Sequence, residues 1–126
     1  MKSFLLAVTS LISIGCAGQH DTLIRAMNAT AASVNASSEF MVEACDARER
    51  SAIDHARNGA DAVAALEEVR THCDRIFAAF DTLRVTHDAA RVAVEHGDDG
   101  AGAILLRLAG QWRELQALVV EWRRVR

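Results

Sequence analysis

Apolar residues recur at steps of three and four along most of the chain, which is the spacing of one face of an α-helix. The first stripe consists of Ile24, Met27, Ala31, Val34, Ser38, Met41, Cys45 and Ala52. The second consists of Leu66, Val69, Cys73, Ile76, Phe80, Leu83, His87, Ala90 and Val94. The third consists of Ala101, Leu105, Leu108, Trp112, Leu115, Val119 and Trp122. The pattern predicts three amphipathic helices, at about residues 22–57, 61–96 and 100–125.

Polar residues and glycines between the stripes predict where the helices begin and end. Asp21 is a candidate N-cap for the first helix, and Asp98 or Asp99 for the third. Gly97 can supply the left-handed residue that ends the second helix. Arg57-Asn58-Gly59 is the expected turn between the first two helices.

One part of the first stripe also permits a different interpretation. The segment from Asn28 to Ser38 is rich in Ala, Ser, Thr and Asn, a composition found in flexible spacers as well as in helices. The apolar periodicity continues through it, so we favour helix.

Two cysteines are placed symmetrically about the expected turn. Cys45 lies fourteen residues before Gly59, and Cys73 lies fourteen residues after it. A helical hairpin that turns there brings the two side by side, and a disulfide would staple a small core in an oxidising compartment. We therefore predict an all-α fold: an antiparallel three-helix bundle with two long helices joined by a Cys45–Cys73 disulfide and a shorter third helix.

Composition narrows the class of protein without naming a function. The 126 residues suffice for one domain, 51% are hydrophobic and only 5% aromatic, and there is no proline, which suits long helices. The formal charge of −3 is small, and charges of both signs are interleaved. We therefore expect no nucleic-acid partner.

The N-terminus has the features of an export signal. Lys2 is followed by an uncharged, mostly apolar run from Phe4 to Ile14. Eleven residues are too few to span a hydrocarbon core about 30 Å thick, but they match the apolar part of a secretory signal. Ile12-Ser13-Ile14-Gly15-Cys16 resembles the lipobox of bacterial lipoproteins, whose cysteine is acylated and becomes the mature N-terminus.

The resemblance implies a domain organisation and a location. Residues 1–15 would be a lipoprotein signal peptide, residues 16–20 a lipidated tether beginning at Cys16, and residues 21–126 the helical bundle. By analogy with the sorting of enteric lipoproteins, Ala17 after the cysteine favours the outer membrane, with the bundle facing the periplasm. Ordinary cleavage after Gly15 or Gly18, which would give a soluble secreted protein, is the alternative.

The cysteine pair also has an alternative chemistry. In the antiparallel register Asp46 lies near His72, so Cys45, Asp46, His72 and Cys73 could offer four metal ligands. The disulfide is the favoured interpretation.

Three large side chains on the stripes are better explained by packing than by chemistry. His87 is expected to be a core histidine hydrogen-bonded to a neighbour, with pH sensing as the minority alternative. Trp112 and Trp122 are expected to fill the core, with a ligand-binding or membrane-interface role as the alternative.

The sequence contains no phosphate-binding loop, nucleophile elbow, zinc-protease motif or haem attachment site, so we expect a protein that is not an enzyme and has no cofactor.

The leading hypothesis is a membrane-anchored envelope lipoprotein acting as a helical spacer or protein-interaction module. Its partners would be the bilayer, through acylated Cys16, and an envelope protein, with a homo-oligomer as a further option because of the heptad-like spacing. The alternatives are a phage or prophage lipoprotein in lysis or superinfection exclusion, and a periplasmic metal- or small-ligand-binding bundle using His72 and His87.

Overall fold

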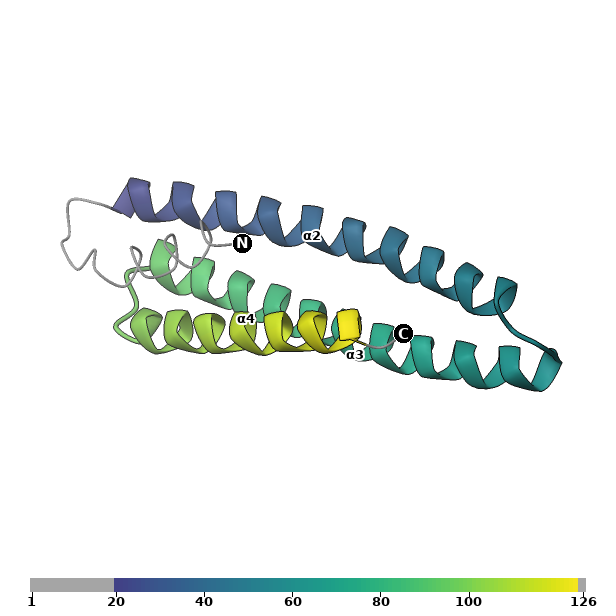
Figure 1. The fold of residues 1–126 in the computed structure, drawn as a ribbon. Coiled ribbons are helices and arrows are strands. Elements are labelled where there is room, and N and C mark those ends of the chain that lie inside the picture. The colour runs from purple at the N-terminus through teal and green to yellow at the C-terminus, as the bar shows by residue number, and fades with distance from the viewer. Residues whose placement is uncertain (1–19, 125–126) are drawn as a thin grey trace.

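A computed structural model describes residues 20–124 and contains three helices: α2 (His20–Asp54), α3 (Gly59–Glu95) and α4 (Ala101–Arg124). Each helix runs in the opposite direction to the one before it, so the three form an antiparallel bundle (Figure 1). The described residues contain no strand. The predicted all-α three-helix bundle is confirmed, whereas the expected signal peptide and Cys16 lie outside the described residues.

The turn between α2 and α3 lies slightly earlier than predicted. Helix α2 ends at Asp54, and α3 already begins at Gly59. The reason is that Asn58 is an effective N-cap: its side-chain oxygen accepts a hydrogen bond from the Asp61 backbone N–H at 2.9 Å. The prediction that Asp21 is the N-cap of the first helix is wrong, because α2 begins at His20 and Asp21 lies in its first turn.

The connection between α3 and α4 matches the prediction at Gly97, but α4 begins at Ala101, so Gly100 directly precedes it and not Asp98 or Asp99 as predicted. Gly97 has a positive φ of 64°, the left-handed conformation expected after a helix. The Asp98 backbone N–H then donates to the Ala93 carbonyl at 2.8 Å, and the Asp98 carboxylate accepts from the Gly100 N–H at 2.7 Å. This tight turn brings α4 back along α3.

The core lies along α3, which supplies most of its fully buried large side chains. A small cluster near the α3–α4 turn contains Met27, Ala90 and Val94. The larger cluster contains Val34, Met41, Cys45, Val69, Cys73, Ile76, Phe80, Leu83, Leu108, Leu115 and Val119. Because Val34 is buried inside continuous helix, the interpretation of residues 28–38 as helix rather than spacer is confirmed.

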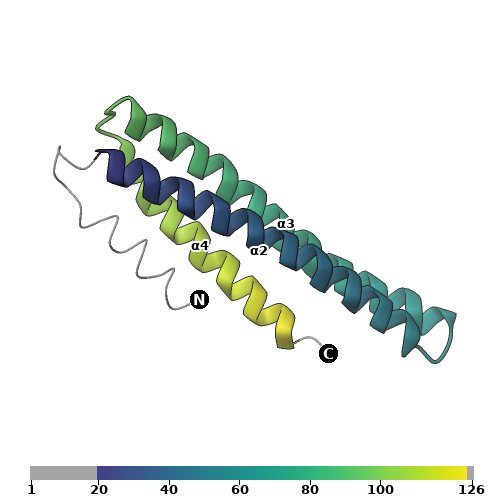
Figure 2. The ribbon, with the colours of Figure 1, turned by 90° about the horizontal axis from the view of Figure 1, so that it is seen from above.

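The bundle is open on one side and at one end. Helices α2 and α4 each pack on α3, but no Cα atom of α2 lies within 8 Å of a Cα atom of α4. Helix α4 runs along the part of α3 nearest their connecting turn and stops well before the α2–α3 turn (Figures 1 and 2). The tip of the α2–α3 hairpin is therefore only two helices thick.

Candidate functional site

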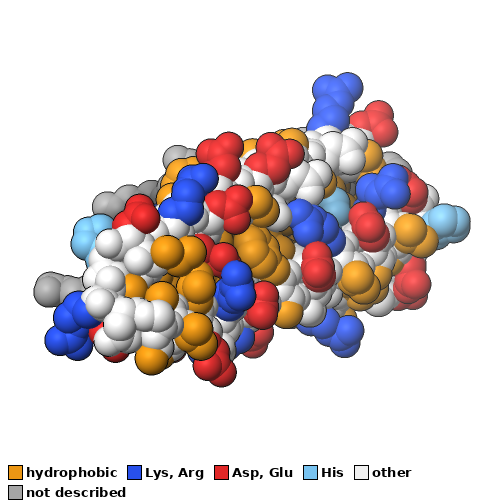
Figure 3. Space-filling view, turned by 90° about the vertical axis from the view of Figure 1, so that its right-hand side faces the viewer, with side chains coloured by type: hydrophobic (Ala, Val, Ile, Leu, Met, Phe, Trp, Pro, Cys, Tyr) orange, Lys and Arg blue, Asp and Glu red, His pale blue; other side chains and the backbone are white. Residues whose placement is uncertain are grey.

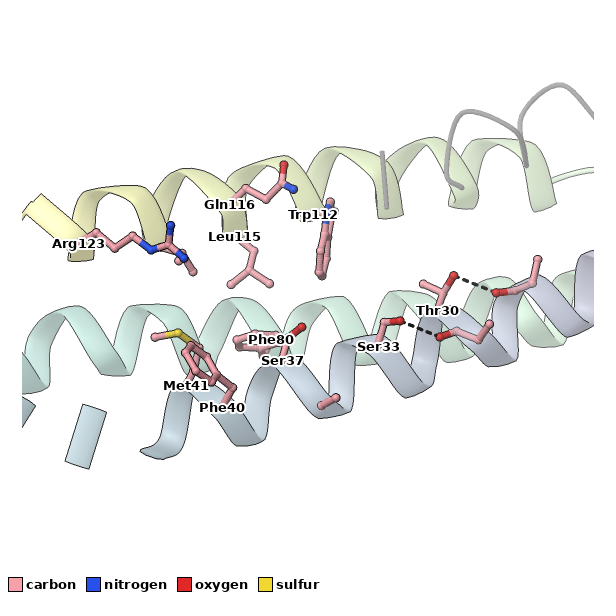
Figure 4. A pocket seen from close by; sticks show the side chains of 14 residues that line it. Thr30, Ser33, Ser37, Phe40, Met41, Phe80, Trp112, Leu115, Gln116 and Arg123 are labelled. Carbon is pink, nitrogen blue, oxygen red and sulfur yellow. Dashed lines mark hydrogen bonds between the residues drawn. The ribbon is translucent and has the colours of Figure 1, made fainter. Parts of the chain in front are cut away.

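An open groove between α2 and α4 is the most distinctive surface of the described bundle. Its volume is about 750 Å³. One wall is α2, with Ala26, Ala29, Thr30, Ser33, Ala36, Ser37, Phe40 and Met41; the other is α4, with Trp112, Leu115, Gln116, Val119 and Arg123. Phe80 of α3 lies between the two walls (Figure 4). We call this concavity the α2–α4 groove.

The α2 wall is less polar than its residue types suggest. The Thr30 hydroxyl donates to the Ala26 carbonyl at 2.9 Å, and the Ser33 hydroxyl donates to the Ala29 carbonyl at 3.1 Å. These bonds turn both hydroxyls back onto their own helix and away from a ligand. At the edge of the same wall Phe40 is 64% exposed. The groove is thus an apolar surface with few directional groups.

An arginine from α2 contacts the C-terminal end of α4, outside the set of residues that line the groove. The Arg48 guanidinium lies 4.4 Å from the centroid of the Trp122 ring, and its Nη1 donates to the Trp122 carbonyl at 2.9 Å. The contact combines a cation–π interaction with a hydrogen bond to a carbonyl of the last helical turn. It joins α4 to α2 although their backbones stay apart.

The cysteines form the predicted disulfide between α2 and α3. The Cα atoms of Cys45 and Cys73 are 6.3 Å apart, and both residues are buried. With both sulfurs in this bond, the four-ligand metal set is not assembled; Asp46 is exposed and His72 half-buried. Within residues 20–124 no three His, Cys, Asp or Glu side chains are grouped closely enough to hold a metal ion.

His87 is the core histidine that its position on the stripe predicts. The residue is buried, and its Nε2 lies 2.8 Å from the Met27 carbonyl oxygen. Because a carbonyl oxygen only accepts, Nε2 carries the proton and Nδ1 faces Asp88, whose Oδ1 is 3.8 Å away. Its visible role is to bridge α3 to α2.

The two tryptophans pack against the larger core cluster and are half-buried. Their predicted packing role is confirmed, but Trp112 also lines the groove. The core stripe of each helix, on which the predicted fold rests, gives no sign of the groove. A second 3–4 stripe on α2, formed by Ala26, Ala29, Ser33, Ala36 and Phe40, was the available signal.

Comparisons with known protein families, curated proteins and solved structures find no match. In the described part of the chain, none of the helices has the length and hydropathy that a membrane crossing requires.

Proposed function

We propose that the protein is a non-catalytic envelope lipoprotein, anchored through acylated Cys16, that acts as a helical protein-interaction module. The observation that carries the interaction role is the α2–α4 groove. An open apolar groove with an exposed phenylalanine at its edge is costly in water and is typical of a protein-binding surface.

Two further features support this proposal. The disulfide holds α2 to α3, and the Arg48–Trp122 contact holds α2 to α4. The walls of the groove are therefore already ordered, so binding costs little conformational entropy. Seen from the end of the α2–α3 hairpin, acidic and basic side chains are interspersed with apolar ones (Figure 3). That face therefore offers a mixed surface, which suits contact with proteins better than binding of one highly charged ligand.

The anchor is tested by the intact mass of the protein extracted from membranes of its native or a closely related host. We expect a mass of residues 16–126 plus acyl chains, increasing by two hydrogens on reduction of the disulfide. A Cys16→Ser variant should leave the membrane fraction. An unmodified mass starting after Gly15 or Gly18 would instead make the protein a secreted one and would overturn the anchor.

The interaction role is tested by a photo-crosslinking residue incorporated in living cells. Position 33 lies in the groove, whereas Val85 is 71% exposed on α3 and does not line it, so position 85 is the matched control. We expect discrete crosslinked products from position 33 and none from position 85. The interaction role would be wrong if the groove position gave no product or the same products as the control.

A further inference from the structure

The face that α2 turns toward the groove is nearly self-complementary about its own midpoint. It consists of Ala26, Ala29, Ser33, Ala36, Phe40 and Glu43, which alternate in steps of three and four. All but Glu43 line the groove. Five of the six residues are exposed, and Ala26 is half-buried, so the face is accessible in the single chain. We call it the groove face of α2.

We infer that this face binds the same face of a second copy of the chain, with the two α2 helices antiparallel. The proposal names the partner for the interaction surface proposed above and does not depend on the lipid anchor.

The shape of the groove face supports this pairing. Within the groove face Phe40 lies near one end, and the residues toward the other end are the small Ala26, Ala29 and Ser33. The midpoint of positions 40 and 29 falls between Val34 and Asn35, and so does the midpoint of Ala36 and Ser33. In an antiparallel pair related by a two-fold axis at that midpoint, each Phe40 lies over the partner's Ala29 and the small residues between allow close helix approach.

The charges on the edge of the face have the same symmetry. Arg25 and Glu43 are exposed, and neither forms an ion pair with another residue of the described range 20–124. They are eighteen residues apart, which is five full helical turns, so both lie on the same side of α2. Their midpoint is Val34, within half a residue of the midpoint set by Phe40 and Ala29. Each Arg25 is thereby placed beside Glu43 of the second copy.

This agreement is the reason to choose a second copy over an unrelated helix. A foreign partner needs a complementary face of its own, and nothing requires the pattern on α2 to be symmetric for such a partner. A two-fold interface does require it, because the same patch must serve as both knob and hole. The groove supplies the second contact: the incoming α2 lies between its partner's α2 and α4, near Trp112.

The arrangement has a consequence for anchored chains. Antiparallel α2 helices centred near position 34 place their two His20 ends at opposite ends of the pair, about 43 Å apart at 1.5 Å per residue. Two anchors on one membrane would then hold the dimer lengthwise along the bilayer.

The test is the molar mass of the full chain in a density-matched non-ionic detergent, measured by sedimentation equilibrium over a range of concentrations. We expect a monomer–dimer equilibrium. Arg25→Glu and Glu43→Arg should each raise the dimer dissociation constant about tenfold or more, because each reversal creates two like-charge contacts per dimer. The double variant Arg25→Glu/Glu43→Arg should recover most of the lost affinity, since it restores both pairs with their signs exchanged.

A second set of variants tests the shape of the interface. Phe40→Ala should raise the dissociation constant by on the order of a hundredfold, since two buried aromatic anchors are lost per dimer. Val85→Ala and Glu67→Arg, exposed positions on α3 outside the groove face, are the matched controls and should have no effect. Helix content from circular dichroism verifies folding of each variant. A monomer at all concentrations would overturn the inference. So would a dissociation constant that Phe40→Ala leaves unchanged, or a double charge variant that does not recover the affinity lost in the two single variants.

Discussion

At the scale of single residues, the side chains that hold the bundle together are those that link one helix to another. His87 joins α3 to the Met27 carbonyl of α2, and Arg48 joins α2 to Trp122 of α4. The ion pairs differ, since they lie at the surface, as between Arg57 and Asp61, and are worth little individually. We therefore expect the contacts of His87 and Arg48 to contribute more to stability than any single surface ion pair.

His87 offers a direct test of this view. We expect His87→Ala to lower the free energy of unfolding by about 2–3 kcal/mol, because it removes a buried side chain and an interhelical hydrogen bond. The measurement is urea denaturation followed by circular dichroism. His55→Ala is the control: His55 is exposed in the turn just after α2 and its ring hydrogen-bonds to the nearby Ser51, so its loss should change stability by less than about 0.5 kcal/mol. Equal effects of the two substitutions would contradict the bridging role.

At the scale of helices, the apolar stripes predicted the existence and number of elements correctly, whereas the ends were less predictable. The stripes are periodic over many turns, so one ambiguous stretch such as residues 28–38 does not hide the helix. Each end depends on a single cap. Because Asn58 caps α3, Gly59 is the first residue of that helix and not the last residue of the turn, as predicted. The groove was not predicted because periodicity says which face is apolar but not how far apart two helices pack on a third.

The contact between Arg48 and Trp122 attaches the end of α4, which leads to a prediction for that helix. We expect Arg48→Ala to lower the free energy of unfolding by about 1–2 kcal/mol through loss of the cation–π contact and of the hydrogen bond to the Trp122 carbonyl. Amide hydrogen exchange should accelerate selectively in the last turns of α4. Arg50→Ala, at an exposed position two residues away, should leave α4 unchanged. Uniform acceleration across all three helices would argue against a local attachment.

At the scale of the whole molecule, packing is uneven along the long axis. All three helices are present from the α3–α4 turn as far as the level of Arg75, whose guanidinium lies 3.5 Å from Glu121 near the end of α4. Beyond that level only α2 and α3 remain, and the apolar residues Ile53 and Val63 are 52% and 64% exposed. The Cys45–Cys73 disulfide lies close to this boundary, between the thick and the thin parts of the bundle.

This placement predicts that the hairpin tip opens first and that the disulfide limits how far the opening spreads. Local unfolding needs less free energy where fewer apolar contacts are buried, so amides near the 55–58 turn should exchange faster than those of α3 from Cys73 to Val94. With the bond intact, fast exchange should stop near Cys45 and Cys73.

In a Cys45→Ala/Cys73→Ala variant, fast exchange should extend further into the bundle. The free energy of unfolding should be lower by about 3–4 kcal/mol, as the chain-entropy relation gives for cysteines 28 residues apart. Hydrogen exchange with mass spectrometry resolves the two regions, and urea denaturation gives the stability change. Equal exchange along α3 in the native protein would show that α4 adds no local stability, whereas an unchanged pattern without the disulfide would show that the core alone holds the boundary.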